Sequence, residues 1–291
     1  MARHGVPVRN VEYPGYNALM ISPDISIGTI GAGNMATALL EGLLATGVVP
    51  SRLWASDPDA HKLQAFAAKG LHATADNAGL IAACDVVILA VKPQVMGTVL
   101  QPLQVALARK PVLLISVAAG IPCAKLAQWT SPQQAIVRCM PNTPALVQAG
   151  ASALFANAQV SAAQKTIALS ILQAVGLACW LDHEQQMDAV TALSGSGPAY
   201  FFLLLEALQA AGIQLGLSAE VAKMLALQTA YGAAKLAQQS DVDAAELRRR
   251  VTSPGGTTEA AIKQFESEQF RDIVARALAK AAARSAELAA S

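Results

Sequence analysis

The stretch Ser26-Ile-Gly-Thr-Ile-Gly-Ala-Gly-Asn-Met-Ala36 determines how the first half of this chain folds. A short apolar run from Ser26 to Ile30 predicts a buried strand, and the glycine-rich turn after it leads directly into a helical pattern. This order is the context that a dinucleotide-binding fingerprint requires. Gly31 permits the tight turn, and Gly33 lets backbone amides approach a pyrophosphate. The small side chain of Ala36 allows the helix to pack closely against the strand. A plain glycine-rich turn is the simpler alternative.

Short apolar runs continue to alternate with helical stretches as far as residue 182, a pattern typical of a parallel sheet. Strands are predicted over residues 26–30, 53–56, 86–91, 112–117, 137–140, 152–155 and 178–181. A Ser161-x-x-Gln164 capping box marks the start of a crossover helix. Beyond residue 182 the strand pattern ends, and alanine- and leucine-rich helices are predicted over residues 188–211, 218–239 and 270–290.

We therefore expect an α/β chain of two domains. Residues 25–182 form a Rossmann-type doubly wound sheet that binds a dinucleotide, and residues 183–291 form an all-helical domain. Residues 1–24 contain no continuous apolar core and fit neither a secretory signal nor a transit peptide. We expect them to be a flexible extension.

The composition excludes several classes of protein. Hydrophobic residues make up 54% of the 291 residues and charged residues 14%, which excludes intrinsic disorder. A formal net charge of +1 and an aromatic content of 4% argue against a nucleic-acid partner, because basic groups and stacking rings are few. Asp85 and Glu206 interrupt the longest apolar stretches, so no membrane span is expected.

The cysteines show no paired spacing of the zinc or redox kind; they are Cys84, Cys123, Cys139 and Cys179. We expect four reduced thiols in a cytoplasmic protein. The carboxylates of the helical half are scattered, so we expect no metal site.

Two charged residues at the ends of predicted strands are candidates for cofactor binding. Asp57 follows the second strand, about 20 residues beyond the fingerprint, where a carboxylate typically accepts ribose hydroxyls and repels a 2′-phosphate. This position favours use of NADH, although a solvent-exposed turn aspartate is nearly as good an interpretation. Lys92 leaves the third strand at the sheet edge where cofactors bind, but alone it would more often be a surface lysine.

Further motifs follow the fingerprint in a set order; they are Ala90-Val-Lys-Pro93, Met140-Pro-Asn-Thr-Pro-Ala145, Leu193-Ser-Gly-Ser-Gly-Pro-Ala199 and Val251-Thr-Ser-Pro-Gly-Gly-Thr-Thr258. With these motifs the chain resembles the pyrroline-5-carboxylate reductases from Ile25 to its last residue. The resemblance implies reduction of 1-pyrroline-5-carboxylate to L-proline by NADPH or NADH. Family members often favour NADPH, and Asp57 without an adjacent arginine puts that preference in doubt here.

The resemblance and the fingerprint together predict the cofactor-binding residues. Those at the predicted sheet edge are Gly31, Ala32, Gly33, Asn34, Met35, Ser56, Asp57, Asn77, Ala90, Val91, Lys92 and Pro93. On the nicotinamide side the resemblance implies Asn142 and Thr143.

In the family, backbone amides and the threonine of a Ser-Pro-Gly-Gly-x-Thr segment hold the substrate carboxylate. The substrate-binding residues predicted in this way are Val251, Ser253, Pro254, Gly255, Gly256, Thr257 and Thr258. Independently of the family, a Gly-Gly turn before a helix presents free N–H groups and the positive dipole end to an anion. A simple helix–helix turn is the alternative. Glu184 is similar in position to a glutamate near the bound ring, in less distinctive surroundings.

Reduction of a cyclic imine requires mainly positioning, because the imine can bind already protonated. Thr258 is the predicted catalytic residue, whose hydroxyl would donate a hydrogen bond, or a proton directly or through water, to the ring nitrogen. The hydroxyacid dehydrogenases oxidise an alcohol with a lysine on a helix of the second domain as general base. The segment from Ser194 to Glu206 contains no lysine, so this chain would lack that base.

Two other functions stay open, a nucleotide sensor without turnover and a reductase of another cyclic imine acid. One ring methylene changes binding by only about 1–3 kcal/mol in a pocket. The long helices are too apolar to be covered by one nucleotide-binding domain, so a homodimer is the minimum that we expect. The resemblance implies intertwined homodimers that assemble further, commonly into decamers, with each active site between one nucleotide domain and the partner's helices.

Overall fold

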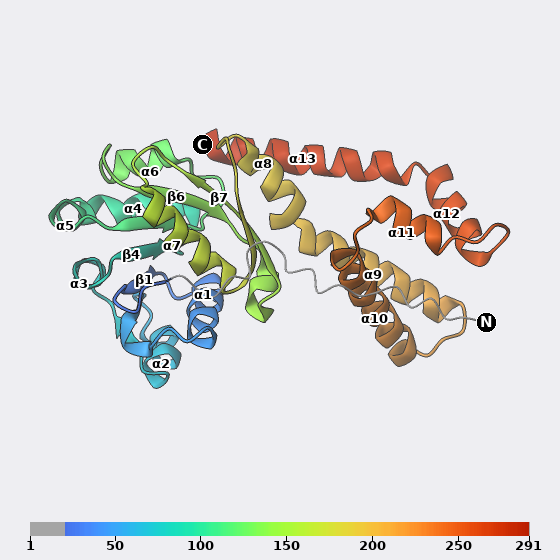
Figure 1. The fold of residues 1–291 in the computed structure, drawn as a ribbon, viewed down its shortest axis with the longest axis horizontal. Helices are drawn as coiled ribbons and strands as arrows, with labels where there is room; N and C mark the ends of the chain where they lie inside the picture. Colours follow the sequence, from blue (N-terminus) through green and yellow to red (C-terminus); the bar gives the residue numbers. More distant parts are fainter. Residues whose placement is uncertain (1–20, 291) are drawn as a thin grey trace. The chain divides into compact units, whose positions relative to one another are not determined.

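The structure, a computed structural model, describes residues 21–290, and these form two compact units (Figure 1). The sheet unit contains residues 21–198 together with residues 278–290, and the helical unit contains residues 199–277. The sheet unit runs past the predicted boundary at residue 182 because helix α8 (Gln186–Val190) and the end of the last helix belong to it. Ser285 Oγ donates a hydrogen bond of 2.7 Å to Asp188 Oδ1 in α8.

The predicted extension falls mostly on residues 1–20, which lie outside the described residues. Ile21 is half-buried and packs against the core of the sheet unit. The described part of the predicted extension, residues 21–24, therefore contacts the core of the sheet unit through Ile21.

An eight-stranded sheet with the order β3-β2-β1-β4-β5-β6-β7-β8 is the frame of the sheet unit. Its strands are β1 (Ile27–Ile30), β2 (Leu53–Ser56), β3 (His72–Thr74), β4 (Val86–Leu89), β5 (Leu113–Ser116), β6 (Ile136–Met140), β7 (Gly150–Ala156) and β8 (Gly176–Trp180). Neighbouring strands are parallel except for β6 and β7, which are antiparallel. The strand order reverses at β1, and this reversal is where dinucleotides bind in doubly wound sheets.

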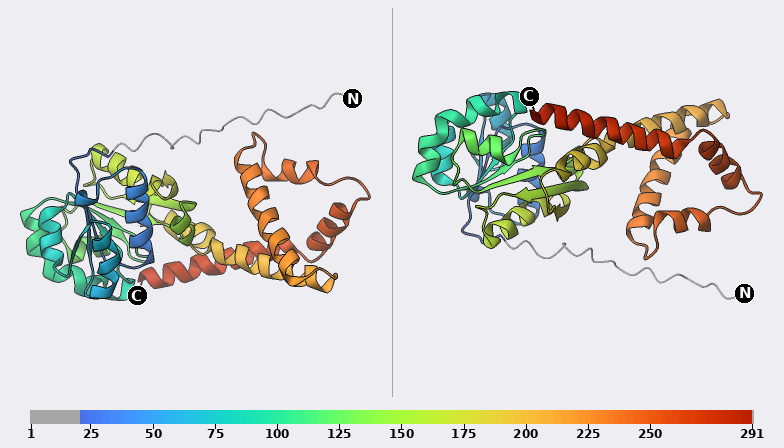
Figure 2. Two further views of the ribbon diagram at one scale, coloured as in Figure 1. Left: turned by 90° about the horizontal axis from the view of Figure 1, so that it is seen from below. Right: turned by 90° about the horizontal axis from the view of Figure 1, so that it is seen from above.

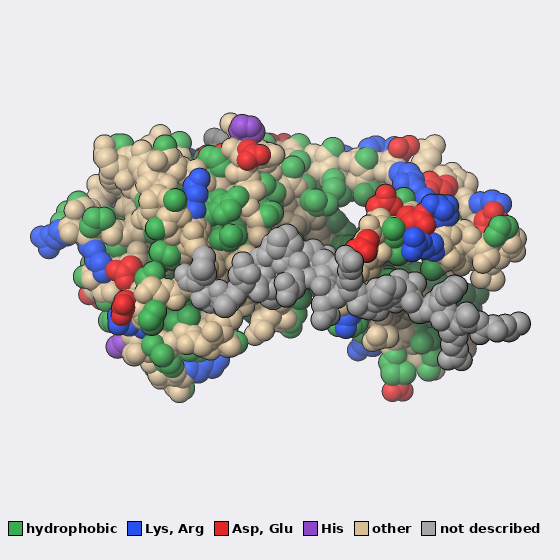
Figure 3. Space-filling view, viewed as in Figure 1, with side chains coloured by type: hydrophobic (Ala, Val, Ile, Leu, Met, Phe, Trp, Pro, Cys, Tyr) green, Lys and Arg blue, Asp and Glu red, His purple; other side chains and the backbone are tan. Residues whose placement is uncertain are grey.

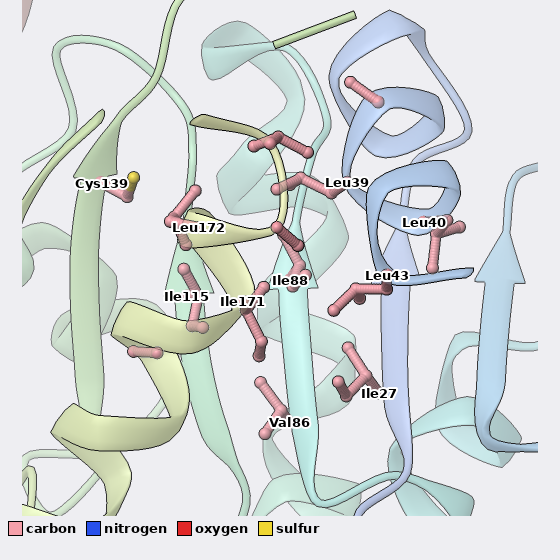
Figure 4. Packing of buried hydrophobic residues seen from close by; sticks show 14 of the residues in the cluster. Ile27, Leu39, Leu40, Leu43, Val86, Ile88, Ile115, Cys139, Ile171 and Leu172 are labelled. Atoms are coloured by element: carbon pink, nitrogen blue, oxygen red, sulfur yellow. The ribbon is translucent and has the colours of Figure 1, made fainter. Parts of the chain in front are cut away.

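Helices cover both faces of this sheet, as the two views of Figure 2 show. The helices are α1 (Asn34–Ala45), α2 (Ala60–Ala68), α3 (Asn77–Ala83), α4 (Met96–Leu100), α5 (Gln104–Arg109), α6 (Cys123–Trp129) and α7 (Ala162–Gln173). On one face, Leu39 and Leu43 of α1 and Ile171 of α7 meet strand residues such as Ile27 and Ile88 (Figure 4). Helices α3 to α6 bury a second cluster against the other face. The predicted Rossmann-type fold is confirmed.

Local sequence signals account for most of these elements. All the predicted strands are present with small shifts at their ends. The predicted capping box is also present, since Ser161 Oγ accepts a hydrogen bond of 3.2 Å from Gln164 N and Gln164 Oε1 accepts one of 2.9 Å from Ser161 N. Strand β3 was not predicted, because it has three residues, carries polar His72 and Thr74, and lies at the sheet edge.

The helical unit contains no strand among its described residues. Its helices are α9 (Gly197–Gln214), α10 (Ala219–Gln238), α11 (Ala244–Arg250), α12 (Thr257–Ser267) and the first part of α13 (Phe270–Ala290). The predicted helix over residues 188–211 is divided into α8, a π-helical turn at Thr191–Gly195, and α9. The two other long helices lie where the sequence predicts them.

The helical unit leaves many large apolar side chains exposed. Phe201, Phe202 and Leu203 on α9 expose 66%, 64% and 67% of their surface. Figure 3 also shows basic and acidic side chains gathered on this unit. The ion pairs of this unit include those of Glu246 with Arg249 and Arg250. No helix within residues 21–290 is long and apolar enough to cross a membrane.

Candidate active site

The fingerprint loop connects β1 to α1 through two glycines that have different roles. Gly31 has a φ of +100°, and its amide donates a hydrogen bond of 2.7 Å to Ser56 O. A Cβ at this position would lie 2.7 Å from Ala90 O, so the adjacent strand end excludes any side chain. Gly33 is exposed, and apart from its chain neighbours no atom of the described residues lies within 4 Å of where its Cβ would be. The first turn of α1 thus opens onto a surface that a pyrophosphate can approach.

Asp57 closes this loop from the end of β2. Its Oδ2 accepts a hydrogen bond of 2.9 Å from Ala32 N, and its Oδ1 accepts one of 3.0 Å from Asp59 N and lies 3.4 Å from Lys62 Nζ. Burial raises the pKa of Asp57, but the two amides and Lys62 outweigh it and hold the pKa below its usual range. The residue is 8% exposed, so the interpretation as a solvent-exposed turn aspartate is wrong.

The remaining predicted cofactor residues surround the same edge of the sheet. Ser56 Oγ donates a hydrogen bond to Asn77 Oδ1 at the start of α3, which ties β2 to that helix. Lys92 is exposed just beyond β4. The predicted residues buried here are Gly31, Ala32, Ser56 and Asp57, and those exposed or half-buried are Gly33, Asn34, Met35, Asn77, Ala90, Val91, Lys92 and Pro93.

Asn142 connects the end of β6 to β7 and to the π-helical turn. Its Nδ2 donates a hydrogen bond of 3.1 Å to Ser194 O, and its Oδ1 accepts one of 2.8 Å from Ala151 N. Thr143 is exposed beside it, at the start of a 3₁₀ helix. Because π-helical turns are frequent at functional sites, the contact between Asn142 and the π-helical turn is a candidate position beside a bound ligand.

The predicted substrate turn joins α11 to α12 in the helical unit. Gly255 has a φ of +70°, and Gly256 N donates a hydrogen bond of 3.0 Å to Ser253 O. Helix α12 begins without a side-chain cap, and the amides of Thr257 and Thr258 find no acceptor among the described residues. Thr258 is half-buried, whereas Val251, Ser253, Pro254, Gly255 and Thr257 are exposed.

Glu184 is half-buried and forms an ion pair with a buried arginine in the sheet unit. Its Oε1 accepts a hydrogen bond of 2.8 Å from Cys123 N at the start of α6 and one of 3.1 Å from Arg138 Nη1. Arg138 is 6% exposed in the middle of β6. The carboxylate therefore links the segment before α8 to β6 and α6, and its contact with a substrate ring stays a prediction.

No three His, Cys, Asp or Glu side chains within residues 21–290 gather into a group that could hold a metal ion.

Comparison with known proteins identifies the family. Residues 184–288 match a profile described as pyrroline-5-carboxylate reductase dimerisation, and residues 26–120 match one described as NADP oxidoreductase, coenzyme F420-dependent. A pyrroline-5-carboxylate reductase of Pseudomonas aeruginosa is 56% identical over 264 residues, which are 90% of this chain and 96% of the relative. The chain belongs to the pyrroline-5-carboxylate reductase family.

Solved structures of family members have the same fold. A pyrroline-5-carboxylate reductase of Coxiella burnetii is 45% identical and aligns with a TM-score of 0.88 over 91% of this chain and 98% of that one. A pyrroline carboxylate reductase of Plasmodium falciparum, with NADP bound, is 32% identical and aligns with a TM-score of 0.83 over 92% of this chain and 100% of that one.

For this pyrroline-5-carboxylate reductase family member, the sequence reasoning missed three charged residues that contact predicted site residues. They are Lys62 beside Asp57, Arg138 beside Glu184, and Glu259 at the substrate turn. Two of them carried a usable signal. An arginine inside the apolar run Ile136-Val-Arg-Cys-Met140 must be paired if the strand is buried. A glutamate in the first turn of a helix commonly caps it.

Proposed function

We propose that this chain reduces 1-pyrroline-5-carboxylate to L-proline with hydride from NADPH or NADH, the last step of proline biosynthesis. The observation that carries the proposal is that a member of this family has both an open fingerprint loop and a Gly255-Gly256 turn. The two amides after this turn have no acceptor among residues 21–290. The fingerprint loop suits a dinucleotide, and the turn suits a small carboxylate.

The fit of a dinucleotide is supported by the space at the fingerprint. The open position of Gly33 and the uncapped start of α1 suit a pyrophosphate, which the amides of Gly33 and Asn34 would hold. The bound nicotinamide supplies hydride. Ser56, Asn77 and Lys92 would contact the rest of the cofactor at the ends of β2 and β4. Asn142, fixed by two hydrogen bonds, would keep the nicotinamide side of the site in shape.

The substrate turn would orient the imine. The amides of Thr257 and Thr258 would hold the carboxylate, and the Thr258 hydroxyl would donate a hydrogen bond to the lone pair that the ring nitrogen gains as hydride adds. Hydride adds to the carbon of the protonated C=N bond, whose electron pair goes to the nitrogen. The nitrogen of proline keeps the proton that the iminium carried, so this chain needs no strong general base.

The assembly and location of the protein belong to the same proposal. We infer a homodimer that can assemble further, up to a decamer, because residues 184–288 match a dimerisation profile and the helical unit exposes a large apolar surface. Each active site would then combine one subunit's sheet unit with the partner's helices. Four free cysteines are consistent with the reducing conditions of the cytoplasm.

The test is the initial rate of cofactor oxidation by the purified protein with 1-pyrroline-5-carboxylate, with NADPH and NADH compared side by side. Formation of proline is the expected result. In Thr258→Ala, turnover should fall while the Kd of NADPH stays unchanged, and Thr258→Ser should recover much of the rate. Full turnover by Thr258→Ala would remove its catalytic role. If the folded protein binds a dinucleotide but forms no proline, another cyclic imine acid or a sensor function becomes the better conclusion.

A further inference from the structure

Glu259 holds the substrate turn from the first turn of α12. Its Oε2 accepts a hydrogen bond of 2.8 Å from Gly255 N, and its Oε1 lies 3.2 Å from Lys263 Nζ one turn further along the helix. The hydrogen bond from Gly255 leads the causes that hold the pKa of Glu259 below its usual range, so the carboxylate is ionised at neutral pH. The turn is thus tied to the helix by a charged side chain.

This contact differs from an ordinary capping box. In a capping box the glutamate at the third helical position binds the amide of the N-cap residue, which here is Gly256. The carboxylate of Glu259 instead reaches one residue further back, and Gly256 N donates to Ser253 O. The amides of Thr257 and Thr258 are left with no acceptor among residues 21–290. These two amides are the ones the proposed function assigns to the substrate carboxylate.

The turn contains two adjacent glycines, so without the hydrogen bond to Glu259 its backbone would be flexible. Gly255 has a φ of +70°. Apart from its chain neighbours, no atom within residues 21–290 lies within 4 Å of where its Cβ would be, so packing among these residues does not fix this conformation. Two adjacent glycines lose more backbone entropy on ordering than any other pair. A hydrogen bond to the Gly255 amide removes that freedom before a ligand arrives.

We propose that Glu259 is a positioning residue for substrate, which fixes Gly255 in its left-handed conformation and so directs the amides of Thr257 and Thr258 at the substrate carboxylate. The inference rests on the proposed function. Glu259 itself does not touch the substrate. Lys263 offsets the repulsion between the Glu259 carboxylate and a bound carboxylate nearby.

The kinetic test compares Glu259→Ala, Glu259→Gln and the control Glu268→Ala, which removes an exposed glutamate at the other end of α12. Glu259→Ala should raise KM for 1-pyrroline-5-carboxylate about tenfold, with a much smaller effect on kcat and no change in the Kd of NADPH. Glu259→Gln keeps an acceptor oxygen and should recover most of the loss. With 1-pyrroline, which has no carboxylate, Glu259→Ala and wild type should have the same KM.

Equal KM values for 1-pyrroline-5-carboxylate in Glu259→Ala and wild type would overturn the inference. An equal loss with both imines would also overturn it, because a merely structural effect would not distinguish them. A second measurement does not depend on turnover. Hydrogen–deuterium exchange of residues 251–258 without substrate should be faster in Glu259→Ala than in wild type and Glu268→Ala. Unchanged exchange in Glu259→Ala would overturn the positioning role of Glu259, whether or not the wild type forms proline. Failure of the wild type to form proline would separately refute the proposed function.

Discussion

At the residue scale, Asp57 has a structural role in addition to the cofactor-binding role that its position in the sequence predicts. The carboxylate was predicted to bind ribose, and it accepts hydrogen bonds from Ala32 and Asp59 within its own chain. With both oxygens engaged, its repulsion of a 2′-phosphate is partly offset by Lys62. We therefore propose that the choice between NADPH and NADH depends on Asp57 and Lys62 together rather than on Asp57 alone.

Asp57→Asn tests the structural part of this duty. The amide nitrogen of asparagine cannot accept a hydrogen bond, so we expect the free energy of unfolding at pH 7 to fall by about 1–3 kcal/mol. The folded-state pKa of Asp57 is lowered, so its titratable contribution is present above the unfolded pKa of about 3.9 and is lost as pH falls through the folded value. The difference from wild type in urea unfolding should be constant from pH 8 to 5 and shrink below about pH 4. A constant difference down to pH 3 would contradict this, and Asp182→Asn, at an exposed position, is the control.

Among the ion pairs of the described residues, we expect the loss of the Arg138–Glu184 pair to lower the free energy of unfolding most. Arg138→Met leaves the Glu184 carboxylate without its cation in a partly buried position, and we expect destabilisation by about 3 kcal/mol. The matched change Arg52→Met removes an exposed pair with Asp24 and should cost less than about 1 kcal/mol. Chemical denaturation of both variants checks the contrast. Similar losses in the two would show that the buried pair is not special.

At the scale of elements, strands and helices could be predicted because their signals are local. Apolar runs mark the buried strands, and Ser161 and Ser218 mark helix starts. Strand β3 has no such run, and the antiparallel direction of β7 depends on how the chain returns after Asn142, which periodicity does not report. The π-helical turn at Thr191–Gly195 is likewise invisible in an otherwise continuous helical pattern.

The candidate site divides in the same way. Gly31, Gly33 and the Gly255-Gly256 turn could be predicted because short motifs define them. The contact of Asp57 with Ala32 and that of Glu184 with Cys123 could not be predicted, because the partners lie 25 and 61 residues apart along the chain. Such pairs are created by strand order, which is a property of the whole sheet.

Gly176 at the start of β8 offers a test of how tightly β7 and β8 approach. It has a φ of +143°, and a Cβ there would lie 2.1 Å from Gly150 O, a backbone atom that cannot move aside cheaply. Gly176→Ala should lower the free energy of unfolding by about 3 kcal/mol or more. Gly47→Ala is the control, because Gly47 has a φ of +95° but open space around it, so only backbone strain of about 1–2 kcal/mol is expected. Thermal unfolding would rank the two, and equal losses would show that strain rather than contact dominates.

At the scale of the whole molecule, the cysteines report which surfaces are covered. Cys84, Cys123 and Cys139 are buried and Cys179 on β8 is exposed. Burial raises the pKa of Cys84 and of Cys123 to about 12, so their thiols stay protonated at pH 8. In the native protein a disulfide reagent should therefore react rapidly with one thiol, and with four after denaturation. Rapid reaction of two or more native thiols would contradict the burial of the others, and Cys179→Ser should abolish the rapid phase.

Helix α13 begins in the helical unit and ends in the sheet unit, where Leu288 meets Gly120 beyond β5. Leu288 and Ala289 also line a cavity of about 530 Å³ together with Pro93 and Gln94, which follow β4. An affinity tag or fluorescent fusion at the C-terminus would follow Leu288 and Ala289, which lie beside the loops that are proposed to receive the nicotinamide nucleotide. Laboratories that produce this protein should expect a C-terminal fusion to alter the measured Kd of NADPH, and should compare it with the cleaved protein before interpreting any kinetics.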